Sequence, residues 1–171
     1  MRQMGSIVDP STIDSQQVIA DQEAIRRAVP QRLEMELLSA VVYSDPERRI
    51  CVAYKDVTLD DFWARGHMPG FPLMPGVLQC EAAAQLSTYF AVTEQLTGGQ
   101  PIVFAALDEV RFRGPVEPPA RLLVVMQAIK VRSSVLISRF ECFVEGRLVS
   151  DGLLKGIAMP IEGVSLTRGA P

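Results

Sequence analysis

The chain is poor in the residues that build metal centres and disulfide frameworks. Its 171 residues include one histidine and three cysteines, Cys51, Cys80 and Cys142. Three widely spaced cysteines match neither a zinc ribbon nor a full set of disulfides. We therefore expect reduced thiols that pack in the core, and no metal site.

Positive charge and long apolar runs are also scarce. Lys and Arg number 17 against 20 Asp and Glu, which gives a net charge of −3. General binding of nucleic acid needs a basic surface, so this balance argues against it. The N-terminus lacks the apolar core of a secretory signal, and charges interrupt each apolar run before it reaches membrane-spanning length. We expect a soluble, cytoplasmic protein with no membrane insertion.

The apolar content is high enough for one core. Hydrophobic residues make up 48% of the chain, whose length suits a single domain. Both ends are polar or irregular in composition. We expect a flexible N-terminal lead over residues 1–12, one domain over 13–160 and a flexible tail over 161–171.

The patterning predicts two early strands, one long helix and four late strands. A first helix is expected from Ile13 to Val29, begun by Asp14 or Ser15 and stopped by Pro30. The expected strands and the long helix cover the segments 32–44, 48–58, 76–96 (the helix), 102–114, 121–132, 135–146 and 147–159. The helix is apolar on most sides. The pattern therefore indicates an α+β fold, an antiparallel sheet wrapped around a long central helix.

Residues that could take part in acid–base catalysis occur between the two early strands and the four late strands. His67, the only histidine, lies in a loop stiffened by prolines, and Glu81 follows on the apolar helix. A neutral imidazole can accept a proton, and a carboxyl group in apolar surroundings tends to keep one. Gly76 starts the helix, where free N–H groups suit a developing oxyanion, and Gln85 lies one turn beyond Glu81. This set suits proton abstraction next to a carbonyl with loss of a β-hydroxyl, and hydrolysis is chemically possible with the same groups.

Each of these residues also has an ordinary explanation. A loop histidine is often structural, a helical glutamate or glutamine often faces solvent or an interface, and glycine near proline often marks a turn. Order and spacing of all four together favour a site.

The stretch from residue 66 to 85 reads GHMPGFPLMPGVLQCEAAAQ. It resembles the signature of the FabZ-type 3-hydroxyacyl-[acyl-carrier-protein] dehydratases, approximately GHFPG-x-P-[IVL]-MPGVL-x-x-E-A-x-A-Q. KDVTLDDFWAR before it and LDEVRFRGPVEP after it are similar to the flanking segments of that family. The resemblance covers roughly Leu33 to Met159.

This resemblance implies a hotdog fold, in which a sheet wraps around a long helix. It also implies a site shared between subunits, with His67 as the catalytic histidine of one subunit and Glu81 as the catalytic acid of its partner. Gly76 is then the backbone donor to the thioester carbonyl. A homodimer is the minimum assembly, and the family commonly forms trimers of dimers.

The implied reaction removes water from a (3R)-hydroxyacyl thioester on acyl carrier protein and gives the trans-2-enoyl thioester, a step of fatty-acid biosynthesis. No metal or redox cofactor is implied, because loss of water changes no oxidation state. Glutamate at position 81 resembles the simple dehydratases, whereas the related dehydratase–isomerases have aspartate. The alternatives are a hotdog-fold acyl-thioesterase, an acyl-CoA hydratase and a noncatalytic acyl-binding subunit.

Three departures from the family pattern concern the substrate rather than the core chemistry. Met68 stands where phenylalanine is usual, so it is expected to alter a wall of the acyl tunnel. PQRLEME (30–36) stands in place of the usual P-H-R-x-P-F, and PVEPPA (115–120) lacks the usual P-G-D. Acyl carrier proteins are strongly acidic, so docking calls for basic residues. The candidates on the late strands are Arg111, Arg113, Lys130, Arg132 and Arg139.

Overall fold

The computed structural model describes residues 5–98, 100–132, 134–160 and 162. It contains the strands β1 (Ala40–Asp45), β2 (Ile50–Val57), β3 (Ile102–Phe112), β4 (Ala120–Arg132), β5 (Val135–Val144) and β6 (Arg147–Ala158). The helices are α1 (Gln22–Ala28) and α2 (Gly76–Thr93), with 3₁₀ turns η1 (Pro10–Thr12) and η2 (Leu33–Met35). The predicted late tail from residue 161 lies outside the described residues, apart from Glu162.

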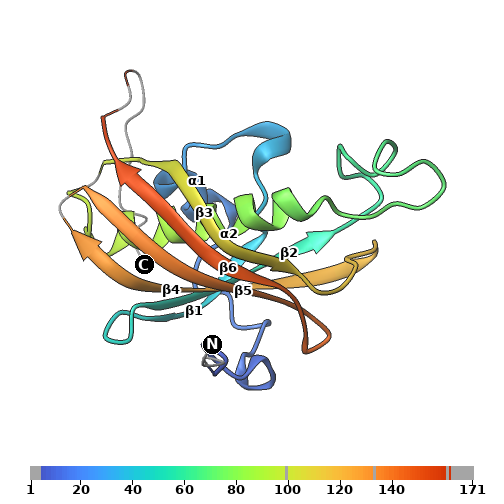
Figure 1. The fold of residues 1–171 in the computed structure, drawn as a ribbon, viewed down its shortest axis with the longest axis horizontal. Coiled ribbons are helices and arrows are strands. Elements are labelled where there is room, and N and C mark those ends of the chain that lie inside the picture. Colours follow the sequence, from blue (N-terminus) through green and yellow to red (C-terminus); the bar gives the residue numbers. More distant parts are fainter. Residues whose placement is uncertain (1–4, 99, 133, 161, 163–171) are drawn as a thin grey trace.

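All six strands form one antiparallel sheet in the order β1-β2-β4-β5-β6-β3. The sheet curves around α2, which runs along its inner face, and α1 packs against α2 and β1 (Figure 1). The predicted arrangement of two early strands, a long helix and four late strands is therefore confirmed. Within the described residues, no helix is both long enough and apolar enough to cross a membrane.

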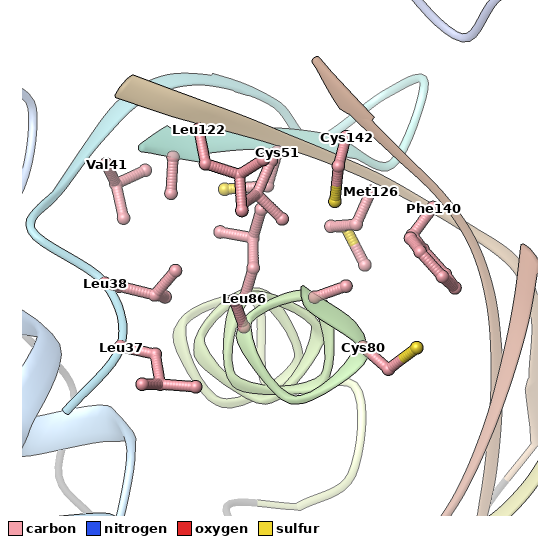
Figure 2. Packing of buried hydrophobic residues seen from close by; sticks show 14 of the residues in the cluster. Leu37, Leu38, Val41, Cys51, Cys80, Leu86, Leu122, Met126, Phe140 and Cys142 are labelled. Carbon is pink, nitrogen blue, oxygen red and sulfur yellow. The ribbon is translucent and has the colours of Figure 1, made fainter. Parts of the chain in front are cut away.

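The core lies between α2 and the concave face of the sheet. Leu86 of α2 faces Leu122 of β4, and Met126 and Phe140 close the same layer (Figure 2). These side chains are at most 1% exposed. Alanines 82, 83 and 91 on α2 are fully buried, which allows the helix to approach the sheet closely. Burial of α2 on most sides is as predicted.

The prediction of a first helix from Ile13 to Val29 is wrong over most of that range. α1 covers only Gln22–Ala28, and its N-cap is Asp21, whose carboxylate accepts a hydrogen bond from the Ala24 N–H at 2.8 Å. The preceding backbone instead bonds to the sheet, because the N–H groups of Ile19 and Ala20 both donate to the Val41 carbonyl. A tertiary hydrogen bond thus overrides the helical pattern before Asp21.

The first predicted strand also begins later than expected. β1 starts at Ala40, and Leu33–Met35 form η2 instead of a strand. The reason is a side chain on α2: Gln85 donates to the Met35 carbonyl at 2.8 Å and accepts from the Leu37 N–H at 3.1 Å. These backbone groups are therefore not free to pair with a neighbouring strand.

The N-terminal segment from Gly5 lies on the convex face of the sheet. Ile7 is 5% exposed and packs with Val52 and Phe143 in a second apolar cluster. Its N–H donates to the buried Glu141 carboxylate at 2.9 Å, and Arg139 forms an ion pair with the same carboxylate. The expected flexible lead therefore includes residues that the structure anchors to β5.

β3 forms one edge of the sheet and carries exposed apolar side chains. Among the described residues it pairs with β6 alone. Val103, Phe104, Leu107 and Phe112 are 37–53% exposed. An edge strand with free backbone groups and exposed apolar side chains is a typical place for another chain to pair.

Candidate active site

The loop that carries His67 is anchored at its start by a buried ion pair. Lys55, at the end of β2, contacts Asp61 with an Nζ–Oδ1 distance of 2.7 Å, and both side chains are largely buried. The other carboxylate oxygen of Asp61 accepts the Thr58 N–H at 2.8 Å. Asp61 thus fixes the turn that leads from the sheet toward His67.

Hydrogen bonds set the orientation of the His67 ring. Its Nδ1 lies 2.6 Å from the Leu73 carbonyl, and the His67 N–H donates to the Trp63 carbonyl at 2.8 Å. A carbonyl only accepts hydrogen bonds, so in the neutral ring Nδ1 carries the hydrogen. Nε2 is then left as the acceptor, the form that a general base requires.

Gly76 opens α2 close to this loop. As the first helical residue, its N–H has no acceptor within the helix. The ring of Phe112 from β3 covers the position where a side chain would stand, because an added Cβ would lie 2.6–2.8 Å from ring atoms. Only glycine permits this approach of the β3 side chain to the start of α2.

Two amide groups hold the Glu81 carboxylate. Gln31 donates from Nε2 to Glu81 Oε1 at 2.9 Å, and Gln85 donates from its Nε2 to the same oxygen at 3.0 Å. Gln85 is 1% exposed and also bonds to Met35 and Leu37 of the η2 region, as described above. Gln85, one turn beyond Glu81 on α2, and Gln31, from the segment before η2, therefore hold the same carboxyl oxygen.

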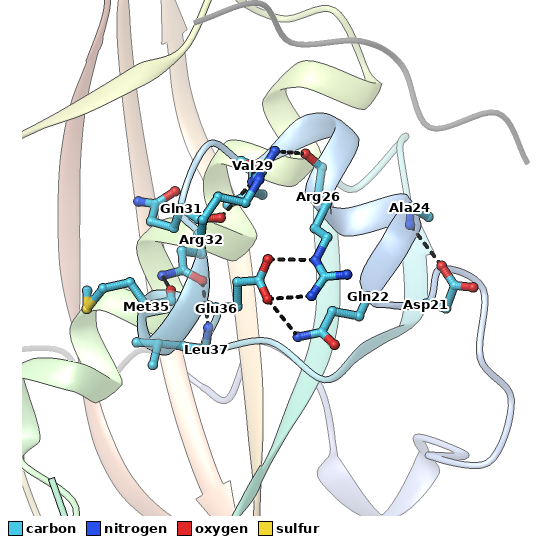
Figure 3. Close-up of polar contacts among 11 residues, drawn as sticks. Asp21, Gln22, Ala24, Arg26, Val29, Gln31, Arg32, Met35, Glu36 and Leu37 are labelled. Atoms are coloured by element: carbon cyan, nitrogen blue, oxygen red, sulfur yellow. Dashed lines mark hydrogen bonds and ion pairs between the residues drawn. The ribbon is translucent and has the colours of Figure 1, made fainter. Parts of the chain in front are cut away.

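The segment around Gln31 is itself clasped to α1. Arg26 and Glu36 form a bidentate ion pair at 2.6 and 2.7 Å, and Arg32 donates to the Arg26, Val29 and Gln31 carbonyls (Figure 3). The hydrogen bond from Arg26 holds the pKa of Glu36 below its usual value, so this carboxyl group is ionised at neutral pH.

His67 and Glu81 of one chain line two different hollows. The Glu81 hollow, about 270 Å³ in volume, lies between α2 and strands β3, β5 and β6. The residues that line it include Gln31, Glu81, Thr88, Val103, Leu136 and Leu154. The His67 hollow, about 590 Å³, is lined among others by His67, Pro75, Gly76, Gln79, Phe112 and Arg113. The structure thus places His67 with Gly76, and Glu81 with Gln85 and Gln31, in two separate groups.

Met68 lines neither hollow in the single chain. Its side chain is 46% exposed, beside the half-exposed Phe71 in the same loop. The predicted role of Met68 in a tunnel wall therefore requires another surface to cover the loop.

The cysteines are buried free thiols, as expected. Burial raises the pKa of Cys51 and Cys142 to about 12 and that of Cys80 to about 11. At neutral pH all three are protonated and therefore poor nucleophiles. No cluster of metal-ligating side chains occurs among the described residues.

The basic residues proposed for carrier docking divide into two groups. Arg113 is paired with Asp151, and Arg139 is paired with Glu141 and mostly buried. Arg111, Lys130 and Arg132 are exposed. The exposed cations are available for an acidic partner, whereas Arg139 is already in an ion pair with Glu141 of the same chain.

The sequence alone did not indicate Gln31. It lies 50 residues before Glu81, and an amide between Pro30 and Arg32 is unremarkable in composition. The one available signal was a departure from the family pattern. Gln31 stands where the FabZ-type dehydratases usually have the histidine of P-H-R-x-P-F.

Comparisons with solved structures define the class to which this fold belongs. A dehydratase heterocomplex, ApeI:P from Xenorhabdus doucetiae, matches with a TM-score of 0.66 and 17% identity over 81% of this chain and 92% of that one. The zebra fish thioesterase superfamily member 2 matches with a TM-score of 0.60 and 13% identity, over 81% and 95%. At these identities the likeness concerns the fold, and the protein has the hotdog fold predicted from its sequence.

Sequence comparisons then give the family. The model of the FabA-like domain matches residues 29–152. The 3-hydroxyacyl-[acyl-carrier-protein] dehydratase FabZ of Streptococcus gordonii is 31% identical over 78% of this chain and 94% of that protein. The enzyme of the same name from Hydrogenobaculum sp. is 30% identical, over 82% and 95%. The chain belongs to the FabA-like family, and within it is similar to the FabZ dehydratases.

Proposed function

We propose that the protein is a dehydratase that removes water from 3-hydroxyacyl thioesters carried by acyl carrier protein, in fatty-acid biosynthesis. The similarity to relatives of that name along most of the chain supports this activity. Two observations carry the chemistry: the Leu73 carbonyl engages His67 Nδ1 and leaves Nε2 free to accept a proton, and two amides hold the Glu81 carboxyl group in a separate hollow.

In this reaction His67 Nε2 takes the proton from the carbon next to the thioester carbonyl. The electrons of that C–H bond form the new C=C bond, and the C–O bond to the β-hydroxyl breaks. Glu81 gives its proton to the departing hydroxyl, which leaves as water. The Gly76 N–H stabilises the charge that develops on the carbonyl oxygen, and proton exchange with solvent then resets His67 and Glu81.

We place the complete site between two subunits. In one chain the two hollows lie at opposite ends of β3, because Val103 and Phe104 line the Glu81 hollow and Phe112 lines the His67 hollow. If two β3 edges pair antiparallel about a twofold axis, the start of one strand meets the end of the other. The Glu81 hollow of each subunit then faces the His67 hollow of its partner.

The exposed side chains support this pairing. Val103, Phe104 and Leu107 are exposed on the free edge of β3, and Phe71 and Val77 are exposed near His67. A partner that covers both regions would bury this apolar surface, which stabilises association. It would also cover the loop at Met68, where the acyl tunnel is predicted. A trimer of dimers, docking through Arg111, Lys130 and Arg132, and a cytoplasmic location stay predictions.

The activity is tested with purified protein and 3-hydroxyacyl thioesters of several chain lengths on acyl carrier protein. The expected product is the enoyl thioester, seen by its absorbance, and His67→Ala or Glu81→Gln should each lower kcat by about 10²- to 10⁴-fold. Release of free thiol instead of enoyl product would indicate a thioesterase. Folded protein with no turnover on any chain length would exclude the dehydratase.

A further inference from the structure

Gln31 makes a contact that links the departure from the family pattern to the acid of the site. Its Nε2 lies 2.9 Å from Glu81 Oε1, and this is the one side-chain hydrogen bond that Gln31 makes to the described residues. The amide must present its N–H₂ end, because Oε1 accepts hydrogen bonds both in a carboxylate and as the carbonyl oxygen of a carboxylic acid.

The two amide donors are distributed unevenly over the carboxyl group. Gln31 and Gln85 both donate to Oε1, and no group among the described residues donates to Oε2. In a carboxylic acid the carbonyl oxygen accepts hydrogen bonds and the other oxygen carries the hydrogen. When Glu81 is a carboxylic acid, double donation to Oε1 therefore makes Oε1 the carbonyl oxygen and leaves the hydrogen on Oε2.

The position of the Gln31 amide is set before substrate binds. Arg32 donates to the Gln31 carbonyl and to the Val29 carbonyl, both at 2.6 Å, and the Arg26–Glu36 pair ties the segment to α1 (Figure 3). Because this backbone is fixed, the Gln31 side chain loses little conformational entropy when it bonds to Glu81.

We infer that Gln31 is a positioning residue that directs the proton of Glu81 to Oε2 and stabilises the carboxylate formed when that proton leaves. As Glu81 gives up its proton, charge develops on the carboxyl group. Two N–H donors already aimed at Oε1 stabilise that charge without rearrangement. The inference rests on the proposed dehydratase and adds a residue to it.

The test is Gln31→Met, which keeps an unbranched side chain of similar size and removes the amide. We expect kcat for dehydration to fall about tenfold, equal to about 1.4 kcal/mol, with KM within about twofold, since the acid step changes and substrate binding does not. The matched control is Gln22→Met, because Gln22 lies nearby on α1 and donates to Glu36 rather than Glu81. It should keep wild-type kcat.

Several results would overturn the inference. Wild-type kcat in Gln31→Met, an equal loss in Gln22→Met, or a change confined to KM would each do so. Gln31→Ser, which leaves room for water, should fold and lose a similar share of kcat. Failure of both Gln31 variants to fold would assign the residue to the fold. Turnover by the wild-type protein separates these outcomes from failure of the proposed function, in which the wild-type protein itself is inactive.

Discussion

At the scale of single residues, the proposed chemistry depends on hydrogen bonds that fix the positions of particular atoms. The Leu73 carbonyl holds His67 Nδ1, and the Gln31 and Gln85 amides hold Glu81 Oε1. The sequence could suggest His67, Gly76, Glu81 and Gln85, because they lie within 20 residues, in one loop and the helix that follows it. Gln31 is far away in the chain, so its contact with Glu81 exists only once η2 and α2 are packed together.

Gly76 offers a test of packing at this scale. Gly76→Ala should lower the free energy of unfolding by about 1–3 kcal/mol, because the new methyl group overlaps the Phe112 ring. In the Phe112→Ala background the same substitution should be neutral or stabilising, since alanine suits a helix better than glycine. Urea unfolding of the four proteins measures both effects. The same cost in both backgrounds would show that Phe112 is not the cause.

At the scale of elements, sequence patterning succeeded where hydrophobic periodicity determines the structure. It succeeded for α2 and for the four late strands, whose core faces pack around the helix. It was wrong from Ile13 to Ala20, where the Ile19 and Ala20 N–H groups donate to the Val41 carbonyl. It was also wrong between residues 33 and 39, where Gln85 donates to the Met35 carbonyl and accepts from the Leu37 N–H. Long-range hydrogen bonds of this kind leave no local periodicity to detect.

The Lys55–Asp61 pair makes a prediction about the element that carries His67. Asp61→Ala should lower the free energy of unfolding by about 3 kcal/mol, because it leaves the Lys55 charge buried without its carboxylate. It should also speed proteolysis between residues 58 and 75, since the Thr58 N–H loses its acceptor. Asp60→Ala, at an exposed neighbour, is the control and should change either quantity little. Equal effects of the two substitutions would contradict an anchoring role for Asp61.

At the scale of the whole molecule, the arrangement of β3 supports the proposal of a site shared between two chains. The strand connects the two hollows, and its free edge and exposed apolar side chains suit a second copy of the chain. The sequence suggested a shared site only through its family resemblance. The separation of His67 and Glu81 into two hollows is a property of the folded chain. We propose that the pairing of two chains brings His67 of one chain opposite Glu81 of the other.

The most direct test of this account mixes two inactive proteins, His67→Ala and Glu81→Gln, and allows their subunits to exchange. Random exchange makes about half of the dimers mixed, each with one intact site of two, so about a quarter of wild-type dehydratase activity should return. Two affinity tags, one on each variant, measure the exchange. Recovery near this level is the predicted result. No recovery, despite demonstrated exchange, would contradict a site shared between subunits.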